Sequence, residues 1–569
     1  MPDEQKTFYQ TLDHMVHAKV AKATSGLSPS VLTEAWMDWA THFSVSPGKQ
    51  MQLIEQAFRN ASALGKASLG DSQPDFAPDK RFSSEGWQKY PFNIFSQAHQ
   101  QSWQWLQDAV SGVHGVTPEH ENLMAFVTGL MSDAAAPSNF AQTNPDVIAA
   151  TLAQGGQNLI RGAQHFSEDA ARLRGNPLPD SPQAFEVGVN LATAPGKVVY
   201  RNDLIELIQY SPETEFVHPE PILIVPAWIM KYYILDLSSH NSLVRFLVSQ
   251  GFTVFMISWK NPDVGDRDLS MEDYRKLGVM DAMDAALAIS HAHKLHAVGY
   301  CLGGTLLSIA AAAMGRDGDE RLASTSFLAA QVDFTEAGQL QLFINDSEVT
   351  LIEDMMEQQG YLSSDQMAGA FAMLRARDLI WAPIIQNYLL GKRSEPFDLM
   401  AWNADGTRMP ARMHSEYLRK LILNNDLAEG RYRVDGKAIA VSDICAPIFA
   451  VGTEDDHVAP WRSVYKLHLF ADTDVTFVLT SGGHNAGIVS EPGHRGRHFR
   501  IADTKATTPY RDPDEWLASN ALEEGTWWKD FAIWLAARSG EPISLPQMGA
   551  KSGAYKALCD APGIYVMQR

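Results

Sequence analysis

The sequence predicts an α/β protein with a mostly parallel sheet, preceded by a mostly helical region. From about residue 183 onward, short apolar and β-branched runs alternate with helical stretches. Before that point, apolar residues recur at three- and four-residue spacing. Strands separated by helices pair in parallel, in a sheet that helices cover on both faces. We therefore expect a helical domain over residues 1–182 and an α/β domain over residues 183–569.

Four amphipathic stretches indicate the helices of the first domain. They are VLTEAWMDWATHF, GKQMQLIEQAFRNASALGK, NIFSQAHQQSWQWLQDAV and ENLMAFVTGLMSDAA. A segment rich in Pro, Ser and Gly separates the first pair from the second and indicates a loop. The segment GNPLPDSP, residues 175–182, has a similar composition and marks the expected domain boundary.

Six short apolar runs indicate the strands of the second domain. They are ILIVP (222–226), TVFMISW (253–259), HAVGY (296–300), STSFLAAQ (324–331), PIFAVG (447–452) and VTFVLTS (475–481). Between residues 333 and about 443 this pattern is lost, and a helical region rich in Met, Leu and Trp takes its place. A helical insertion late in such a sheet typically forms a cap over an active site, so we expect a cap at about residues 333–443.

Composition and charge limit the classes of function. The chain has 569 residues, of which 45% are hydrophobic and 20% charged, as expected for a folded protein of more than one domain. Its formal net charge of −21, without a long Lys/Arg run, disfavours a nucleic-acid partner. Three scattered cysteines do not form a disulfide framework, and no segment resembles a secretory signal or a transmembrane helix. We therefore expect a cytoplasmic protein, and attachment to a lipid or polymer surface stays open.

The sharpest local motif is GYCLGG, residues 299–304, which follows a predicted strand and precedes the helical run TLLSIAAAAM. It has the form of the nucleophile elbow of α/β-hydrolases, with Cys301 in the usual position of Ser. A strained turn lifts such a side chain above the sheet, and the glycines let neighbouring backbone approach. The amide of Leu302 then faces the developing oxyanion. By itself the motif fits a buried cysteine in an ordinary turn equally well.

Two further segments supply partners for the nucleophile in the α/β-hydrolase order of nucleophile, acid and histidine. The strand PIFAVG leads into TEDDHVAPW, which places Asp456 just past a strand end. The strand VTFVLTS leads into GGHNAG, which places His484 at the equivalent point of the next strand. Glu454 and Asp455 are adjacent carboxylates and stay alternatives to Asp456. Together the positions predict an α/β-hydrolase fold with a Cys301–His484–Asp456 triad.

The residue types of this triad indicate acyl transfer. A nearby imidazole lowers the pKa of a thiol, so we expect His484 to take the proton of Cys301 while Asp456 orients His484. A thiol that exchanges with a thioester forms an intermediate of similar energy, which can still acylate a hydroxyl. An esterase has no such need. The cysteine therefore favours a CoA-type thioester as the substrate.

Several long segments in fixed order resemble class I polyhydroxyalkanoate synthases, and the resemblance covers most of the chain. In the first domain the segments are DKRFSSEGWQKYPF (79–92) and APSNFAQTNPDVI (136–148). In the second domain they include PAWIMKYYILDL (226–237), the GYCLGG elbow, PFDLMAWNADGTRMP (396–410), EDDHVAPW (454–461) and GTWWKDFAIWLAARSG (525–540). This series is much stronger evidence than the elbow alone.

The resemblance implies polymerisation of an (R)-3-hydroxyacyl-CoA into polyester with release of CoA. Cys301 would carry the acyl group and the growing chain, and His484 would be its base. Asp456 would assist deprotonation of the attacking hydroxyl, through or beside His484. Arg375 matches a basic position near the CoA phosphates, although such an arginine also commonly bridges helices. No cofactor and no metal is implied, since the CoA thioester is the substrate. A homodimer and association with polyester granules and granule proteins are implied as well.

The resemblance also indicates the substrate pocket. Leu302 and a segment with Ala227, Trp228 and Met230 are expected to line it, and this segment would supply the second oxyanion donor. His457, beside the acid, matches a position associated with the site, and its role as an orienting neighbour is as well supported. Ala227 and Met230 stand where many members carry Pro and Asn, so acyl-chain preference is not transferred.

Two other functions stay open at this point. One is a thioesterase or small-molecule acyltransferase on the same scaffold, and the other is a non-catalytic granule-associated protein. A cap that excludes water favours polymerisation over hydrolysis. An intact set of Cys301, Asp456 and His484 disfavours the non-catalytic protein, because folding does not require all three.

Two remaining groups of residues have simpler interpretations. His291, His293 and His296 are as dense as the ligands of a metal site, but they lie at a helix-to-strand junction, where basic residues complement a helix C-terminus. We therefore do not expect them to bind a metal. Cys445 and Cys559 are interpreted as packed or incidental thiols.

Overall fold

The computed structural model describes residues 8–24, 28–69, 79–173, 185–393, 395–551 and 553–569, and the predicted boundary at 175–182 lies outside them. The chain forms two compact units. The α/β unit comprises Met1–Lys22, Gln183–Met367 and Pro396–Arg569, and the helical unit comprises Ala23–Pro182 and Ala368–Glu395. Residues 8–22 thus group with the α/β unit, and part of the predicted cap groups with the helical unit.

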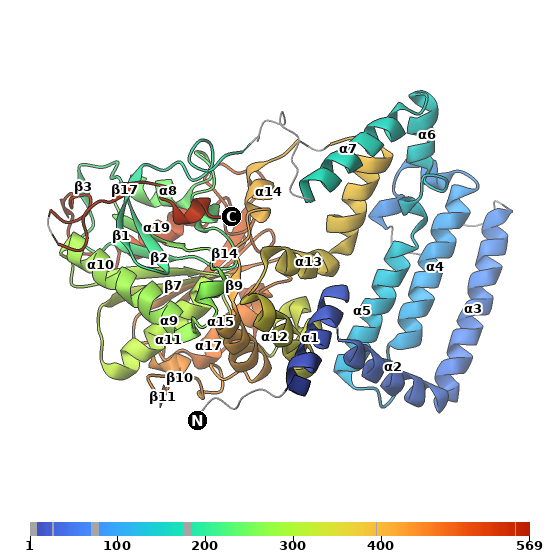
Figure 1. Cartoon of the computed structure of the whole chain (residues 1–569), viewed down its shortest axis with the longest axis horizontal. Coiled ribbons are helices and arrows are strands. Elements are labelled where there is room, and N and C mark those ends of the chain that lie inside the picture. The colour runs from blue at the N-terminus through green and yellow to red at the C-terminus, as the bar shows by residue number, and fades with distance from the viewer. Residues whose placement is uncertain (1–7, 25–27, 70–78, 174–184, 394, 552) are drawn as a thin grey trace. The chain divides into compact units, whose positions relative to one another are not determined.

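An eleven-stranded sheet forms the centre of the α/β unit (Figure 1). Its six central strands are parallel, in the spatial order β13 (Val475–Thr480), β12 (Ile448–Thr453), β7 (Leu322–Leu328), β6 (Leu295–Tyr300), β4 (Ile222–Val225) and β5 (Val254–Trp259). Antiparallel strands extend both edges, namely β14 (His498–Thr504) and β15 (Glu523–Glu524) beyond β13, and β2 (Ile205–Tyr210), β1 (Gly196–Arg201) and β17 (Cys559–Asp560) beyond β5. The predicted parallel sheet is confirmed.

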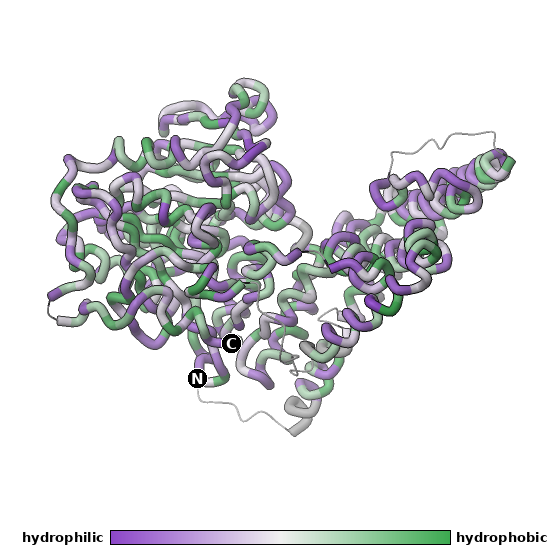
Figure 2. Tube along the Cα trace, turned by 90° about the horizontal axis from the view of Figure 1, so that it is seen from above, coloured by the Kyte–Doolittle hydropathy of each residue, from purple (hydrophilic) through white to green (hydrophobic). Residues whose placement is uncertain are grey.

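The side chains of the strands fill two separate hydrophobic cores, because successive residues of a strand point to opposite faces. In β12, Ala450 belongs to one core and Phe449 to the other. The first core includes residues of α10 (Asp281–Ser290) and α11 (Leu302–Asp317), and the second includes residues of α8 (Leu243–Ser249) and α19 (Trp528–Ala536). Figure 2 shows hydrophobic stretches gathered inside this unit. Cover on both faces explains why the strands are continuous apolar runs.

The predicted cap region is mostly helical, as expected. In the α/β unit it contains η7 (Gly338–Phe343), α12 (Asp346–Gln359), α14 (Asp398–Asn403), α15 (Ala411–Glu416) and η10 (Tyr417–Leu423). The helical unit takes up the two π-helical segments η8 (Arg377–Trp381) and η9 (Ile384–Leu389). The helix α13 (Ser364–Leu374) runs across the division between the two units.

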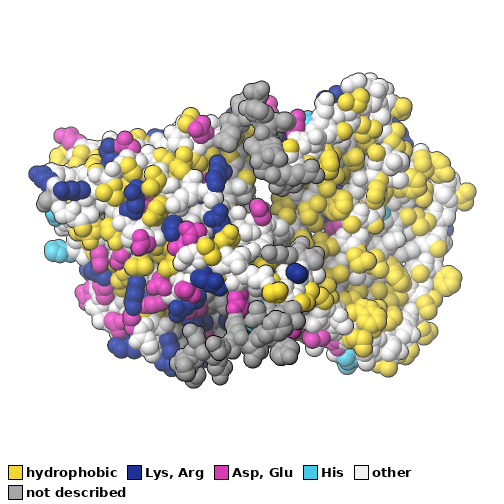
Figure 3. Space-filling model, in the orientation of Figure 1, with side chains coloured by type: hydrophobic (Ala, Val, Ile, Leu, Met, Phe, Trp, Pro, Cys, Tyr) yellow, Lys and Arg dark blue, Asp and Glu magenta, His cyan; other side chains and the backbone are white. Residues whose placement is uncertain are grey.

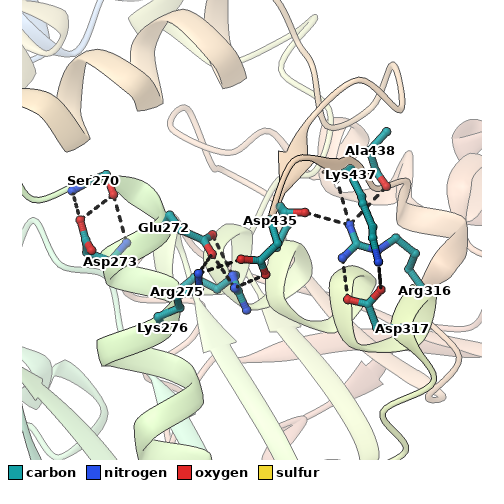
Figure 4. Close-up of polar contacts among 11 residues, drawn as sticks. Ser270, Glu272, Asp273, Arg275, Lys276, Arg316, Asp317, Asp435, Lys437 and Ala438 are labelled. Carbon is teal, nitrogen blue, oxygen red and sulfur yellow. Dashed lines mark hydrogen bonds and ion pairs between the residues drawn. The ribbon is translucent and has the colours of Figure 1, made fainter.

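Ion pairs attach the last part of the cap region to the body of the α/β unit (Figure 4). The hairpin of β10 (Arg433–Val434) and β11 (Lys437–Ala438) presents Asp435, whose carboxylate lies 3.2 Å from Arg275 and 2.7 Å from Lys276 of η6 (Tyr274–Met280). On the other side, Arg316 of α11 donates to the carbonyl oxygen of Val434 over 3.1 Å. These contacts fix the chain just before it enters β12, the strand that leads to Asp456.

The helical unit consists of α2 (Pro29–Ser44), α3 (Pro47–Ser68), α4 (Phe92–Val110), α5 (Pro118–Ala134), α6 (Pro145–Ala153) and α7 (Gln157–Leu173), together with η8 and η9. The four predicted amphipathic helices correspond to α2–α5, and α3, α4 and α5 lie side by side (Figure 1). Proline begins α2, α3, α5 and α6, where its missing amide hydrogen costs nothing. Hydrophobic side chains cover much of the visible face of this unit (Figure 3). None of the helices in the described parts of the chain is both long and apolar enough to cross a membrane.

Candidate active site

Cys301 lies at the turn between β6 and α11 and has a backbone conformation that side-chain-bearing residues rarely adopt. Its φ is 52° and its ψ is −126°. The amide of Cys301 donates to the carbonyl of Leu328 on β7 over 2.9 Å, and its own carbonyl accepts from the amides of Gly304 and Thr305. The surrounding hydrogen bonds thus hold a strained turn, as expected for a nucleophile elbow.

Close backbone contacts explain the glycines of the elbow. A Cβ atom on Gly303 would lie 2.1 Å from the carbonyl oxygen of Val225 and 2.5 Å from that of Pro226. A Cβ atom on Gly299 would lie 2.3 Å from the Cα of Gly304. Only glycine fits at these positions, and the fit presses the elbow against the end of β4.

Asp456 follows the C-terminal end of β12 and is held by three hydrogen bonds in addition to that from His484. The amides of Val458 and Ala459 donate to Oδ1 over 2.8 Å each, and the hydroxyl of Thr453 donates to Oδ2 over 3.0 Å. Burial alone would raise the pKa of Asp456, but the charge of His484 and these amide hydrogen bonds hold it below its ordinary value. Asp456 is therefore ionised at neutral pH.

His484 follows the C-terminal end of β13 and connects the other two residues. Its Nδ1 lies 2.8 Å from Oδ2 of Asp456, and the charge of Cys301 acts on the same imidazole. Burial alone would lower the pKa of His484, but the charges of Cys301 and Asp456 and the hydrogen bond to Asp456 raise it well above its ordinary value. The three residues come together because β6, β12 and β13 are parallel and end at the same edge of the sheet.

The segment after β4 lies beside the elbow, as the contacts of Gly303 require. Ala227 and Trp228 are buried, and Met230 is half-buried and forms an isolated β-bridge with Gly406. The indole ring of Trp228 lies 6.4 Å from the ring of Tyr417, in an edge-on arrangement. This segment is positioned to form a wall next to Cys301.

Three family models match the chain. They are "Poly-beta-hydroxybutyrate polymerase (PhaC) N-terminus" over residues 78–247, "Poly-beta-hydroxybutyrate polymerase N terminal" over residues 7–49, and "alpha/beta hydrolase fold" over residues 220–490. The chain is 38% identical to the poly(3-hydroxyalkanoate) polymerase of Methylorubrum extorquens, over 90% of this chain and 84% of that protein. It is 32% identical to the poly(3-hydroxyalkanoate) polymerase subunit PhaC of Cupriavidus necator, over 93% of this chain and 90% of that protein.

The chain belongs to the poly(3-hydroxyalkanoate) polymerase family. The resemblance and the α/β-hydrolase fold inferred from the sequence are both confirmed. Membership of this family supports polymerisation and does not favour the two alternative functions. Among solved structures, a monoacylglycerol lipase of Paleococcus ferrophilus matches 59% of this chain and 99% of its own, with 14% identity and a TM-score of 0.34.

Two residues beside the triad of this polymerase were not predicted as site residues. The hydroxyl of Tyr300 donates to Oδ1 of Asn485 over 2.6 Å, and the ring of Tyr300 lies 5.7 Å from that of His484. Tyr300 thus connects the elbow to the loop that carries His484. Their positions directly before Cys301 and directly after His484 were the available signal.

A third unpredicted residue of this polymerase site is Tyr417, on η10 of the cap region. Burial, followed by the charge of Cys301, raises the pKa of Tyr417 above its ordinary value, and its ring lies 6.4 Å from that of Trp228. No local motif marks this tyrosine, because only the fold of the cap region brings it to the elbow.

The structure places the remaining predicted residues as follows. Leu302 is half-buried at the first position of α11, and His457 is half-buried directly after Asp456. Arg375 belongs to the helical unit, where its Nε donates to Asp378 over 3.1 Å. Its contact with CoA stays a prediction.

The histidines at the junction of α10 and β6 have structural environments. His296 is fully buried, with Nδ1 2.7 Å from the hydroxyl of Ser324 and Nε2 3.0 Å from that of Ser539. His291 ends α10 in the left-handed conformation, with a φ of 57°, and His293 is exposed. The hydrogen bonds of His296 thus hold a buried side chain in the core, and His291 caps the end of α10.

Proposed function

We propose that this protein polymerises (R)-3-hydroxyacyl-CoA thioesters into polyester, through an acyl-enzyme on Cys301. The observation that carries the proposal is the hydrogen bond between His484 and Asp456 at the sheet edge where the Cys301 elbow also lies, in a chain of the polymerase family. The reaction needs no cofactor besides the CoA thioester that it consumes.

The first half-reaction transfers the acyl group to the enzyme. His484 takes the proton of Cys301, and the thiolate attacks the carbonyl carbon of the thioester. The amide of Leu302, at the start of α11, stabilises the oxyanion, with the backbone after Pro226 as the second donor. The carbon–sulfur bond to CoA then breaks, and the CoA thiolate leaves with the proton from His484.

The second half-reaction forms the ester bond. The hydroxyl of a 3-hydroxyacyl group gives its proton to His484 and attacks the carbonyl carbon of the acyl-enzyme, and the thiolate of Cys301 leaves. The pKa of Asp456 is lowered, and both of its oxygens accept hydrogen bonds, so it is a poor base. Asp456 therefore acts through His484, which it orients and whose positive charge it stabilises.

Attachment to a polyester granule is part of the proposal. On α3, Met51, Ile54 and Phe58 follow one another at helical spacing, and 70%, 57% and 73% of their respective surfaces are exposed. An exposed apolar stripe on a water-facing helix marks an interaction surface, and a polyester surface presents apolar chains to it. The homodimer and the contact of Arg375 with the CoA phosphates rest on the family resemblance.

An assay with purified protein tests the proposed function. (R)-3-hydroxybutyryl-CoA is added, and released CoA and insoluble polymer are measured for the wild type, Cys301→Ala and the matched control Cys445→Ala, which changes an exposed cysteine. We expect polymer from the wild type and the control, and none from Cys301→Ala. CoA release without polymer would indicate a thioesterase instead. Light scattering with and without substrate tests the dimer.

A further inference from the structure

Four side chains that the proposed reaction does not use come together where the N-terminal helix meets the first long helix of the cap region. His14 and His17 lie on α1 (Phe8–Ala23), and Asp354 and Glu357 lie on α12. Both pairs have three-residue spacing, which places each pair on one face of its helix. Both helical segments belong to the α/β unit, so the cluster is part of one compact body.

Hydrogen bonds order the cluster around the carboxylate of Asp354. Nδ1 of His14 contacts one oxygen of Asp354, and Nδ1 of His17 lies 2.8 Å from the other. Nδ1 of His14 also lies 3.5 Å from the carboxylate of Glu357. Only 5% of the Asp354 side chain is exposed, against 36% for His14 and 38% for Glu357. The cluster is therefore anchored in the interior and open to solvent on one side.

The packing of α1 shows that the cluster is not an accidental surface contact. Ala18 and Ala21, on the same helical face as His14 and His17, are buried in the core cluster that also contains Met355 of α12. Small residues at these positions let α1 lie close to this core. His14 and His17 thus lie beside the buried part of α1.

We propose that His14, Asp354 and Glu357 bind a divalent transition-metal ion of the Zn²⁺ type. Within the described residues, a ligand atom from each of the three lies within 4.8 Å of the other two, so small side-chain rotations bring them around one ion with bonds of about 2 Å. Imidazole nitrogen together with carboxylate oxygen suits zinc and its neighbours, whereas magnesium and calcium prefer oxygen alone.

His17 has a positioning role in this site. It holds the second oxygen of Asp354 by the 2.8 Å hydrogen bond, so the first oxygen faces His14 and Glu357. Such outer partners orient a metal-binding carboxylate. The bound ion would join the N-terminal helix to α12 and neutralise the two carboxylates. This site is separate from the triad, and the proposed reaction does not depend on it.

The test measures metal binding by the full-length chain, purified without a polyhistidine tag and treated with EDTA. Zinc stoichiometry and affinity are determined by calorimetry and elemental analysis, and Co²⁺ is added separately to record its visible absorption. The variants are His14→Gln, Glu357→Gln and His17→Gln, with His293→Gln as the matched control in an exposed histidine of the same unit.

We expect one Zn²⁺ per chain in the wild type and the control, and affinity at least about tenfold weaker in each of the three variants. Zinc should also slow hydrogen exchange in α1 of the wild type but not of Glu357→Gln. Glu357 is partly exposed, so this variant should keep the fold, which circular dichroism checks. No zinc binding by the wild type, or equal binding by wild type and variants, would overturn the metal site and leave a purely hydrogen-bonded histidine–aspartate contact.

Discussion

Nδ1 of His484 lies 2.8 Å from Oδ2 of Asp456, although the two residues come from different strands. Asp456 is positioned by amides of its own loop and by the hydroxyl of Thr453, and His484 is positioned by Asp456. The charge on Asp456 therefore fixes the tautomer and the orientation of the imidazole that faces Cys301.

Replacement of Asp456 by Asn is expected to lower kcat for CoA release by about 10³–10⁴, because the amide favours the wrong imidazole tautomer. Asp455→Asn is the matched control, since Asp455 is an adjacent exposed carboxylate. We expect it to stay within about twofold of the wild type. Steady-state kinetics with (R)-3-hydroxybutyryl-CoA checks both variants. A large loss of kcat in Asp455→Asn together with a small loss in Asp456→Asn would show that Asp455, and not Asp456, orients His484.

The hydrogen bond between Tyr300 and Asn485 is expected to hold the His484 loop against the elbow. Tyr300→Phe and Asn485→Ala should each lower kcat several-fold, and the double variant should lose little more than either single variant. The coupling free energy in such a double-mutant cycle should be about 1 kcal/mol. Full additivity of the two losses in kcat would show that this contact does not support the loop.

Burial makes His296 a source of acid sensitivity. Burial lowers the pKa of His296 to about 3 in the folded protein, whereas a histidine in the unfolded chain has a pKa of about 6.5. Between these values the unfolded chain binds a proton that the folded chain does not, so the free energy of unfolding falls as the pH is lowered. His296→Asn should reduce this slope by up to about 1.4 kcal/mol per pH unit.

Urea unfolding at pH 6.5, 5.5 and 4.5 measures the effect. The exposed His293 provides the control variant His293→Asn, which should keep the wild-type slope. His414 should still contribute a slope in His296→Asn, since burial lowers its pKa to about 4. An unchanged slope in His296→Asn would contradict the role of His296.

The apolar stripe on α3 is expected to bind polyester. Ile54→Glu with Phe58→Glu should reduce co-sedimentation of the protein with polyester granules, because charged groups would have to leave water on contact. Gln52→Glu with Lys66→Gln, at exposed positions on another face of α3, changes the net charge equally and should bind as the wild type. Equal sedimentation of both pairs would place the granule contact elsewhere.

The sequence was sufficient to predict the sheet and the meeting of His484 with Asp456, because Cys301, Asp456 and His484 each come within four residues of a strand end. Their catalytic roles stay predictions. Parallel strands end at one edge, so the order of Cys301, Asp456 and His484 along the chain was enough to bring them together. The contact between Tyr300 and Asn485 was not predicted, because the two motifs that contain them do not show that their side chains meet. Residues far apart in sequence, such as His14 and Asp354, meet only through tertiary packing.

The assignment of helices to the two units also could not be predicted from local sequence. No helix was predicted at α1, and local spacing does not say which core receives its small apolar residues. Ala18 and Ala21 join the core of the α/β unit, and η8 and η9 of the cap region group with the helical unit. Local patterns predict the elements, whereas the assignment of an element to a unit depends on shape complementarity between surfaces.

The central claim is that Cys301 carries the acyl group. Protein mixed rapidly with (R)-3-hydroxybutyryl-CoA and quenched in acid is digested, and the peptides are analysed by mass spectrometry. We predict a hydroxybutyryl adduct on the peptide that contains Cys301 in the wild type and in Cys445→Ala, and no adduct in Cys301→Ala. The account would be contradicted if the Cys301→Ala variant made as much polymer as the wild type, or if the adduct formed only on another residue.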